Sequence, residues 1–85
     1  MSEYTYVRAP FPNTVSWHRE IVWDDEKVIG EIRESIESRA NAKRYHVCKY
    51  EPMQVADGFV EIADTVKVFS SISDCKDFIN NGGLK

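Results

Sequence analysis

The residues best suited to chemistry are two cysteines and two histidines, and their spacing does not assemble a reactive site. His46 and Cys48 lie two positions apart, whereas His18 and Cys75 lie far from them in the chain. A zinc site needs about four such ligands, usually in closely spaced pairs. On one strand, the side chains of His46 and Cys48 would be about 7 Å apart, which is too long for a hydrogen bond in a nucleophile pair. We therefore favour two free, packed thiols over a disulfide bridge.

Other signatures of catalysis are missing from the sequence. No Gly-x-Ser-x-Gly element surrounds a serine, and no glycine-rich loop could hold a phosphate group. The acidic residues are explained by helix starts and solvated faces without general acid–base chemistry. We expect a protein that is not an enzyme and that holds no metal and no cofactor.

Charge is sorted along the chain, although the net charge is only −3. Residues 20–37 hold seven acids and two bases, residues 39–49 hold four bases and no acid, and residues 51–77 hold six acids and two bases. Blocks of this kind can mark surfaces that bind partners. They can also be solvated faces and helix ends that collect charge without any partner.

The acidic blocks suggest the leading function. A negative surface attracts basic grooves in other proteins and speeds association. We expect a small binding protein that modulates or inhibits a larger protein partner through acidic and aromatic surface. The candidate partner-binding residues form the acidic face of an expected helix: Glu26, Glu31, Glu34 and Glu37.

The basic block suggests a second function. Cations mixed with aromatic rings are typical of surfaces that bind single-stranded nucleic acid. Four cations are few beside 14 acids, so nucleic acid is the less favoured partner. The residues of this alternative nucleic-acid patch are Arg39, Lys43, Arg44, Tyr45 and Lys49.

The element expected to carry both surfaces is a helix over residues 25–41. One apolar stripe is predicted by residues that recur at steps of mostly three and four, which are Val28, Ile29, Ile32, Ile36 and Ala40. Acids at the start and bases at the end suit the helix dipole. A strand in which Val28, Gly30 and Ile32 alternate is the competing interpretation, and Ile29 counts against it because it breaks the alternation.

Strands and one further helix complete the expected fold. Alternating apolar residues predict strands over residues 15–23 and 43–51, and residues 59–69 form either one strand or a hairpin. Ser71 is positioned to cap a helix whose buried side carries Ile72, Cys75, Phe78 and Ile79. We expect an α+β fold in the order β-β-α-β-β-β-α, with two helices on one face of a mostly antiparallel sheet of four to five strands.

Length and composition place the chain among small single domains. Its 85 residues are 42% hydrophobic, which is enough for one core. We expect an N-terminal strand or arm with a proline-rich turn over residues 1–14, and one compact α+β domain over residues 15–85. No stretch approaches the roughly 20 apolar residues of a membrane span, and no secretory leader is evident. A cytoplasmic location is therefore expected, and a homodimer is plausible because edge strands can pair.

Overall fold

The computed structural model describes residues 4–9, 18–35, 37–39 and 41–85 of the chain. These residues form five strands and one helix, which is a mostly-sheet α+β fold. The elements in chain order are β1 (Tyr4–Arg8), β2 (Arg19–Asp24), β3 (Lys27–Glu34), β4 (Tyr45–Val55), β5 (Gly58–Phe69) and α1 (Ile72–Asn80).

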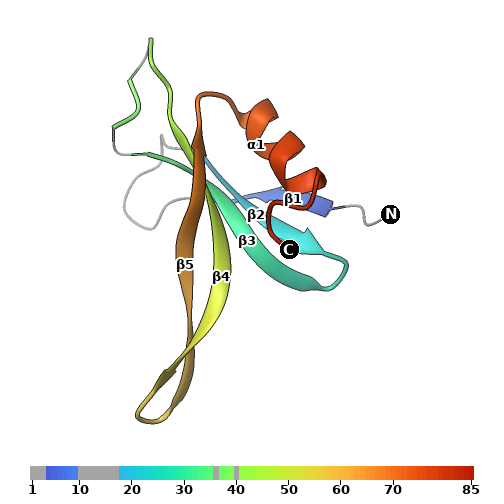
Figure 1. Ribbon diagram of the computed structural model, residues 1–85, viewed down its shortest axis with the longest axis vertical. Helices are drawn as coiled ribbons and strands as arrows, with labels where there is room; N and C mark the ends of the chain where they lie inside the picture. Colours follow the sequence, from blue (N-terminus) through green and yellow to red (C-terminus); the bar gives the residue numbers. More distant parts are fainter. Residues whose placement is uncertain (1–3, 10–17, 36, 40) are drawn as a thin grey trace.

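The five strands make one open antiparallel sheet in which spatial order follows chain order, β1-β2-β3-β4-β5. Short connections between consecutive strands favour this arrangement, because a tight turn can join only antiparallel neighbours. Helix α1 lies across one face of the sheet, as Figure 1 shows. The expected N-terminal strand is present as β1, which forms an edge of the sheet beside β2.

The core lies between α1 and the covered face of the sheet. Val22, Ile32 and Val47 come from three adjacent strands and are fully buried against Cys75 and Ile79 of the helix. Tyr45 and Leu84 close the ends of this cluster. Because side chains alternate along a strand, the residues next to these three point to the opposite, open face.

Helix α1 forms as the sequence predicts. The Ser71 hydroxyl accepts a hydrogen bond from the Asp74 amide at 3.1 Å, which satisfies one of the donors left free in a first turn. Cys75 and Ile79 are the buried residues of the helix. After the helix, Gly82 adopts a positive φ of 95°, and Leu84 returns to the core.

The helix expected over residues 25–41 is wrong, and so is the element order built on it. Residues Lys27–Glu34 form β3, which is hydrogen-bonded to β2 on one side and to β4 on the other. Asp25 and Glu26 form the tight turn before it, with Asp25 at a φ of 55°. Asp tolerates this left-handed conformation better than most residues. Ile36 and Ala40, the end of the expected apolar stripe, lie outside the described residues.

A β-bulge explains why the strand pattern was missed. Val22 pairs with Gly30, but Trp23 pairs with Val28, so Ile29 is an extra residue without a partner on β2. A bulge of this kind interrupts the alternation of side chains. The break at Ile29 that argued against a strand is therefore the mark of a bulged strand, and Ile29 packs against the core.

Gly30 is required by close packing. A Cβ atom at this position would collide with the Cys48 carbonyl oxygen and lie 2.9 Å from Leu84 Cδ1. The absence of a side chain at Gly30 lets the C-terminal segment approach the sheet.

Strands β4 and β5 are much longer than their neighbours and project beyond them (Figure 1). Strand β5 is one continuous strand with a register shift opposite Val47 and Cys48, which resolves the choice between one strand and a hairpin. We call residues 51–62 the arm. Gly30 pairs with Lys49 at the end of the β3–β4 ladder, so along the arm the two strands pair only with each other.

Pro52 lies inside β4, which continues past residue 51, the expected end of this strand. It pairs with Glu61 of β5, and its other side has no strand beside it. Proline is tolerated at such a position because no ladder requires its missing amide hydrogen.

Within the described residues, no helix is long and apolar enough to cross a membrane.

Candidate functional site

The four glutamates of the expected acidic face do not form one surface. Glu26 is exposed in the β2–β3 turn, and Glu37 is exposed in the loop after β3. Glu31 and Glu34 lie in β3 and are buried, each in a separate set of hydrogen bonds. The grouping depended on the helix, so it is lost with the helix.

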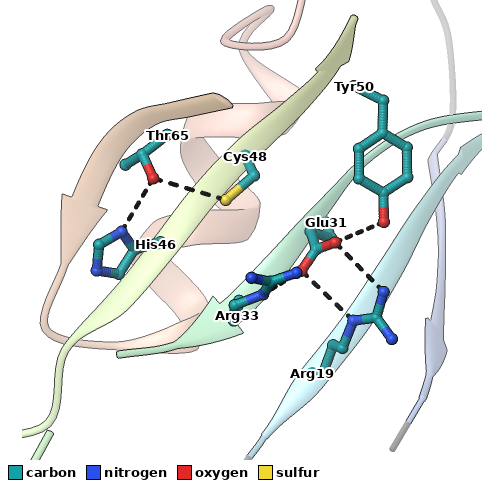
Figure 2. A network of polar contacts seen from close by, with 7 residues as sticks. All are labelled: Arg19, Glu31, Arg33, His46, Cys48, Tyr50 and Thr65. Carbon is teal, nitrogen blue, oxygen red and sulfur yellow. Dashed lines mark hydrogen bonds and ion pairs between the residues drawn. The ribbon is translucent and has the colours of Figure 1, made fainter. Parts of the chain in front are cut away.

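Glu31 is the centre of a polar cluster on the open face (Figure 2). Its carboxylate is 1% exposed and accepts hydrogen bonds from Arg33 Nε at 2.6 Å and from the Tyr50 hydroxyl at 2.6 Å. Arg19 donates to both carboxylate oxygens at 3.4 Å. The residues come from three adjacent strands, so the cluster ties β2, β3 and β4 together on the side away from α1.

The cluster keeps Glu31 ionised. Burial alone would raise the pKa of Glu31, but hydrogen bonds from Tyr50, Arg33 and Arg19 outweigh burial and lower the pKa below its usual value of 4.5. Burial and the neighbouring Glu31 carboxylate raise the pKa of Tyr50 to about 12. A permanently charged carboxylate with a neutral phenol stabilises the sheet and leaves no proton poised for transfer near neutral pH.

Glu34 and Glu20 are also held by hydrogen bonds. Glu34 accepts from the His18 amide at 3.0 Å and from Lys43 Nζ at 3.3 Å. Glu20 contacts His18 Nε2 at 2.7 Å and Lys76 Nζ at 3.2 Å, which links β2 to α1. Burial would raise the pKa of each carboxyl, but the hydrogen bonds outweigh it and lower both pKa values. These groups stabilise the fold.

The expected nucleic-acid patch is divided. Arg39, Lys43 and Arg44 are exposed in the β3–β4 loop. Tyr45 is buried in the core, so its ring is not available to stack on a base. Lys49 lies further along β4, within 4.0 Å of Glu51. Of the five residues of this patch, only Arg39, Lys43 and Arg44 share one loop.

The two cysteines lie on opposite faces of the sheet and are both free. Cys48 is on the open face, and its Sγ lies 3.8 Å from Thr65 Oγ1. Cys75 is in α1 within the core. Burial raises the pKa of both thiols, that of Cys75 to about 12. Among the described parts of the chain, no group of three or more His, Cys, Asp or Glu side chains could hold a metal ion.

Four of the seven large hydrophobic residues that are exposed in the described part of the chain lie in the arm. Phe59 is 72% exposed, and Met53, Val55 and Val60 are 40–46% exposed. Met53 pairs with Val60, and Val55 lies two residues beyond Met53 on β4, so these three share one face of the hairpin. Phe59 pairs with Gln54 and lies on the other face, so a partner that holds the arm in a groove would contact both faces. Exposed apolar groups gathered in this way are typical of interaction surfaces.

The arm is also acidic. Its charged residues are Glu51, Asp57 and Glu61, with no base between positions 51 and 62. All three are exposed. This acidic hairpin was not among the surfaces expected from the sequence, because strand pairing past Pro52 was not expected. The Asp57-Gly58 turn with Met53 and Val55 before it and Val60 and Ile62 after it was the available signal.

A pocket of about 600 Å³ lies on the open face beside the β3–β4 loop. Its floor includes Cys48, Ala63 and Val68 from β4 and β5. Arg33, Arg44 and His46 also line it. The His46 ring Nδ1 is 3.1 Å from Thr65 Oγ1, and this contact fixes the orientation of the imidazole (Figure 2).

The chain was compared with known proteins at three levels. No protein-family model, no curated protein sequence and no solved structure matches it.

Proposed function

We propose that this protein binds a larger protein partner through the β4–β5 arm and modulates or inhibits that partner by occupying a groove on it. The observation that carries the proposal is an exposed hairpin whose apolar residues are Met53, Val55, Phe59 and Val60 and whose charged residues are all acidic. The partner groove would have an apolar floor and basic walls.

Continuity with the core supports this choice of surface. Val47 is buried beneath α1, and Met53 and Val55 follow it at even spacing on the same side of β4. The helix covers the strand near Val47 and does not extend over the arm (Figure 1). A partner would supply to the arm the apolar cover that α1 supplies to the rest of the strand.

The negative charge of the arm supports a partner with a basic groove. Three carboxylates on a narrow hairpin repel acidic surfaces and attract basic ones, which speeds association more than it deepens affinity. Phe59 would supply most of the binding free energy, because aromatic side chains that enter a pocket are typical hot spots. Nucleic acid has less support as a partner, since the exposed arm is acidic and Tyr45 is buried. Two free, protonated thiols support a reducing, cytoplasmic setting.

The test begins with a photo-crosslinking amino acid in place of Phe59, in cells of the source organism. The captured protein is then purified and its binding to the unmodified chain is measured by calorimetry. Phe59→Asp should weaken binding by about 30-fold or more. Val7→Asp is the matched control, because Val7 is 48% exposed at the other end of the sheet.

Charge is tested on the same pair of proteins. Asp57→Lys and Glu61→Lys should slow association and flatten its dependence on salt, whereas Glu26→Lys in the exposed β2–β3 turn should not. Equal effects of Phe59→Asp and Val7→Asp would contradict the proposal. Crosslinks only between copies of this chain would show that the arm serves a homodimer instead.

A further inference from the structure

A second surface, remote from the arm tip, has the features of a small-molecule site. The pocket beside the β3–β4 loop has a volume of about 600 Å³, within the range of ligand sites. We propose that it binds a small phosphate monoester, with the phosphate among Arg33, Arg44 and His46 and an apolar moiety on the floor. This site does not depend on the proposed partner or on the arm.

The side chains of Arg33 and His46 and the backbone that carries Arg44 are held in place. Arg33 is fixed through Nε, which donates to Glu31 at 2.6 Å. The backbone amide of Arg44 donates to Ser38 Oγ at 3.2 Å, which anchors the loop at that residue. His46 Nδ1 contacts Thr65 Oγ1, so Nε2 is the ring atom available to a ligand. Figure 2 shows His46 and Arg33 on the same face of the sheet. Preorganised donors bind anions better than mobile ones.

The local charge is positive although the chain is acidic. Glu31 is shared by Arg19 and Arg33, and Glu34 is paired with Lys43. The charged residues that line the pocket itself are Arg33, Arg44, Glu34 and Glu37. With Arg19, Lys43 and Glu31, which pair with these residues but do not line the pocket, four cationic side chains lie near three carboxylates. Arg is well suited to bind phosphate oxygens.

The apolar residues of the pocket are the reason for proposing a phosphate ester and not free phosphate. Ala63, Val68 and Cys48 line the pocket and present small apolar surfaces. The pocket is several times larger than one phosphate group needs. A flat organic group would fill the remainder and lose contact with water.

The experiment uses phenyl phosphate, inorganic phosphate and benzoate, titrated into the intact protein and followed by NMR. Phenyl phosphate should shift the His46 ring and Thr65 amide signals and bind at least several-fold more tightly than inorganic phosphate or benzoate. Shifts spread evenly over the β3–β4 loop, or equal binding of all three probes, would overturn the proposal.

Three variants separate the site from general attraction to cations. Arg44→Gln should weaken binding of phenyl phosphate about tenfold, because it removes charge-assisted hydrogen bonds. Arg39→Gln changes charge equally in the same loop, but Arg39 does not line the pocket, so binding should be unchanged. Glu37→Gln should tighten binding about two- to threefold by removing a like charge. Equal losses in Arg44→Gln and Arg39→Gln, or weaker binding in Glu37→Gln, would refute the site.

Discussion

The two halves of the β4–β5 hairpin are built from the same two strands and have opposite environments. Near the sheet, Val47 is fully buried, and the polar residues of the open face are tied to β2 and β3. In the arm, Val55 is 40% exposed and charged residues such as Asp57 extend into solvent. The difference arises from neighbours, because β3 stops pairing with β4 at Lys49 and α1 does not extend over the arm. Stability and binding can therefore be changed separately in one hairpin.

Removing a carboxylate should give the largest contrast. Glu31→Ala leaves Arg19 and Arg33 beside an empty, buried position and should cost about 3–5 kcal/mol in the free energy of unfolding. Glu61→Ala in the arm should change it by less than about 0.5 kcal/mol. Urea unfolding of the two variants measures both values. Similar losses would mean that the arm contributes to stability.

Truncation of one valine in each half of β4 gives the next contrast. Val47→Ala should cost about 2–3 kcal/mol, since it loses apolar burial and leaves a cavity. Val55 lies on the same side of β4 but is exposed, so Val55→Ala should cost less than about 0.5 kcal/mol in the free energy of unfolding. Thermal unfolding of both variants measures the two losses of stability. Binding of the proposed partner should be weakened by Val55→Ala and not by Val47→Ala.

The boundary between the halves can be tested at Gly30. Gly30→Ala should cost about 1–3 kcal/mol, because the added methyl must displace the Cys48 carbonyl or the Leu84 side chain. Amide exchange should show increased opening at Leu84 and at the β3–β4 pairing, with the arm unchanged. A neutral Gly30→Ala variant would mean that the C-terminal segment is not packed as described.

The dependence on pH should come from the inner half. The pKa of Glu31 is lowered on folding, so its stabilisation is present above pH 4.5 and is lost as pH falls through the folded pKa. The pKa of Tyr50 is raised from 10.0 to about 12, so its stabilisation is present below pH 10 and is lost between pH 10 and 12.

Urea midpoints measured from pH 3 to 11 test both limbs. Glu31→Gln should flatten the acid limb. Tyr50→Phe should reduce the alkaline limb, to which Tyr6 and Cys75 also contribute because their pKa values are raised to about 12 as well. Glu61→Gln is the control for the acid limb and should leave it unchanged. An acid limb that persists in Glu31→Gln would assign the effect to Glu20 or Glu34, whose pKa values are also lowered.

Sequence reasoning succeeded where local signals agree with the tertiary structure. Helix α1 follows from its Ser71 cap and its apolar spacing, and the alternation over residues 43–51 predicts a strand where β4 begins. It failed at β3, where the bulge at Ile29 makes a strand resemble a helix. The acidic site failed with that helix, and the basic patch lost Tyr45 to the core.

Composition and local pattern alone determined an acidic chain, a predominantly antiparallel α+β fold, a capped C-terminal helix and the absence of a recognisable catalytic motif. Tertiary structure decided which carboxylates are buried, how far β4 and β5 extend beyond the sheet, and which residues line the pocket. The physical reason is that strand pairing is long-range. Partners such as Glu31 and Tyr50 are 19 positions apart, and only the register of β3 with β4 brings them into contact.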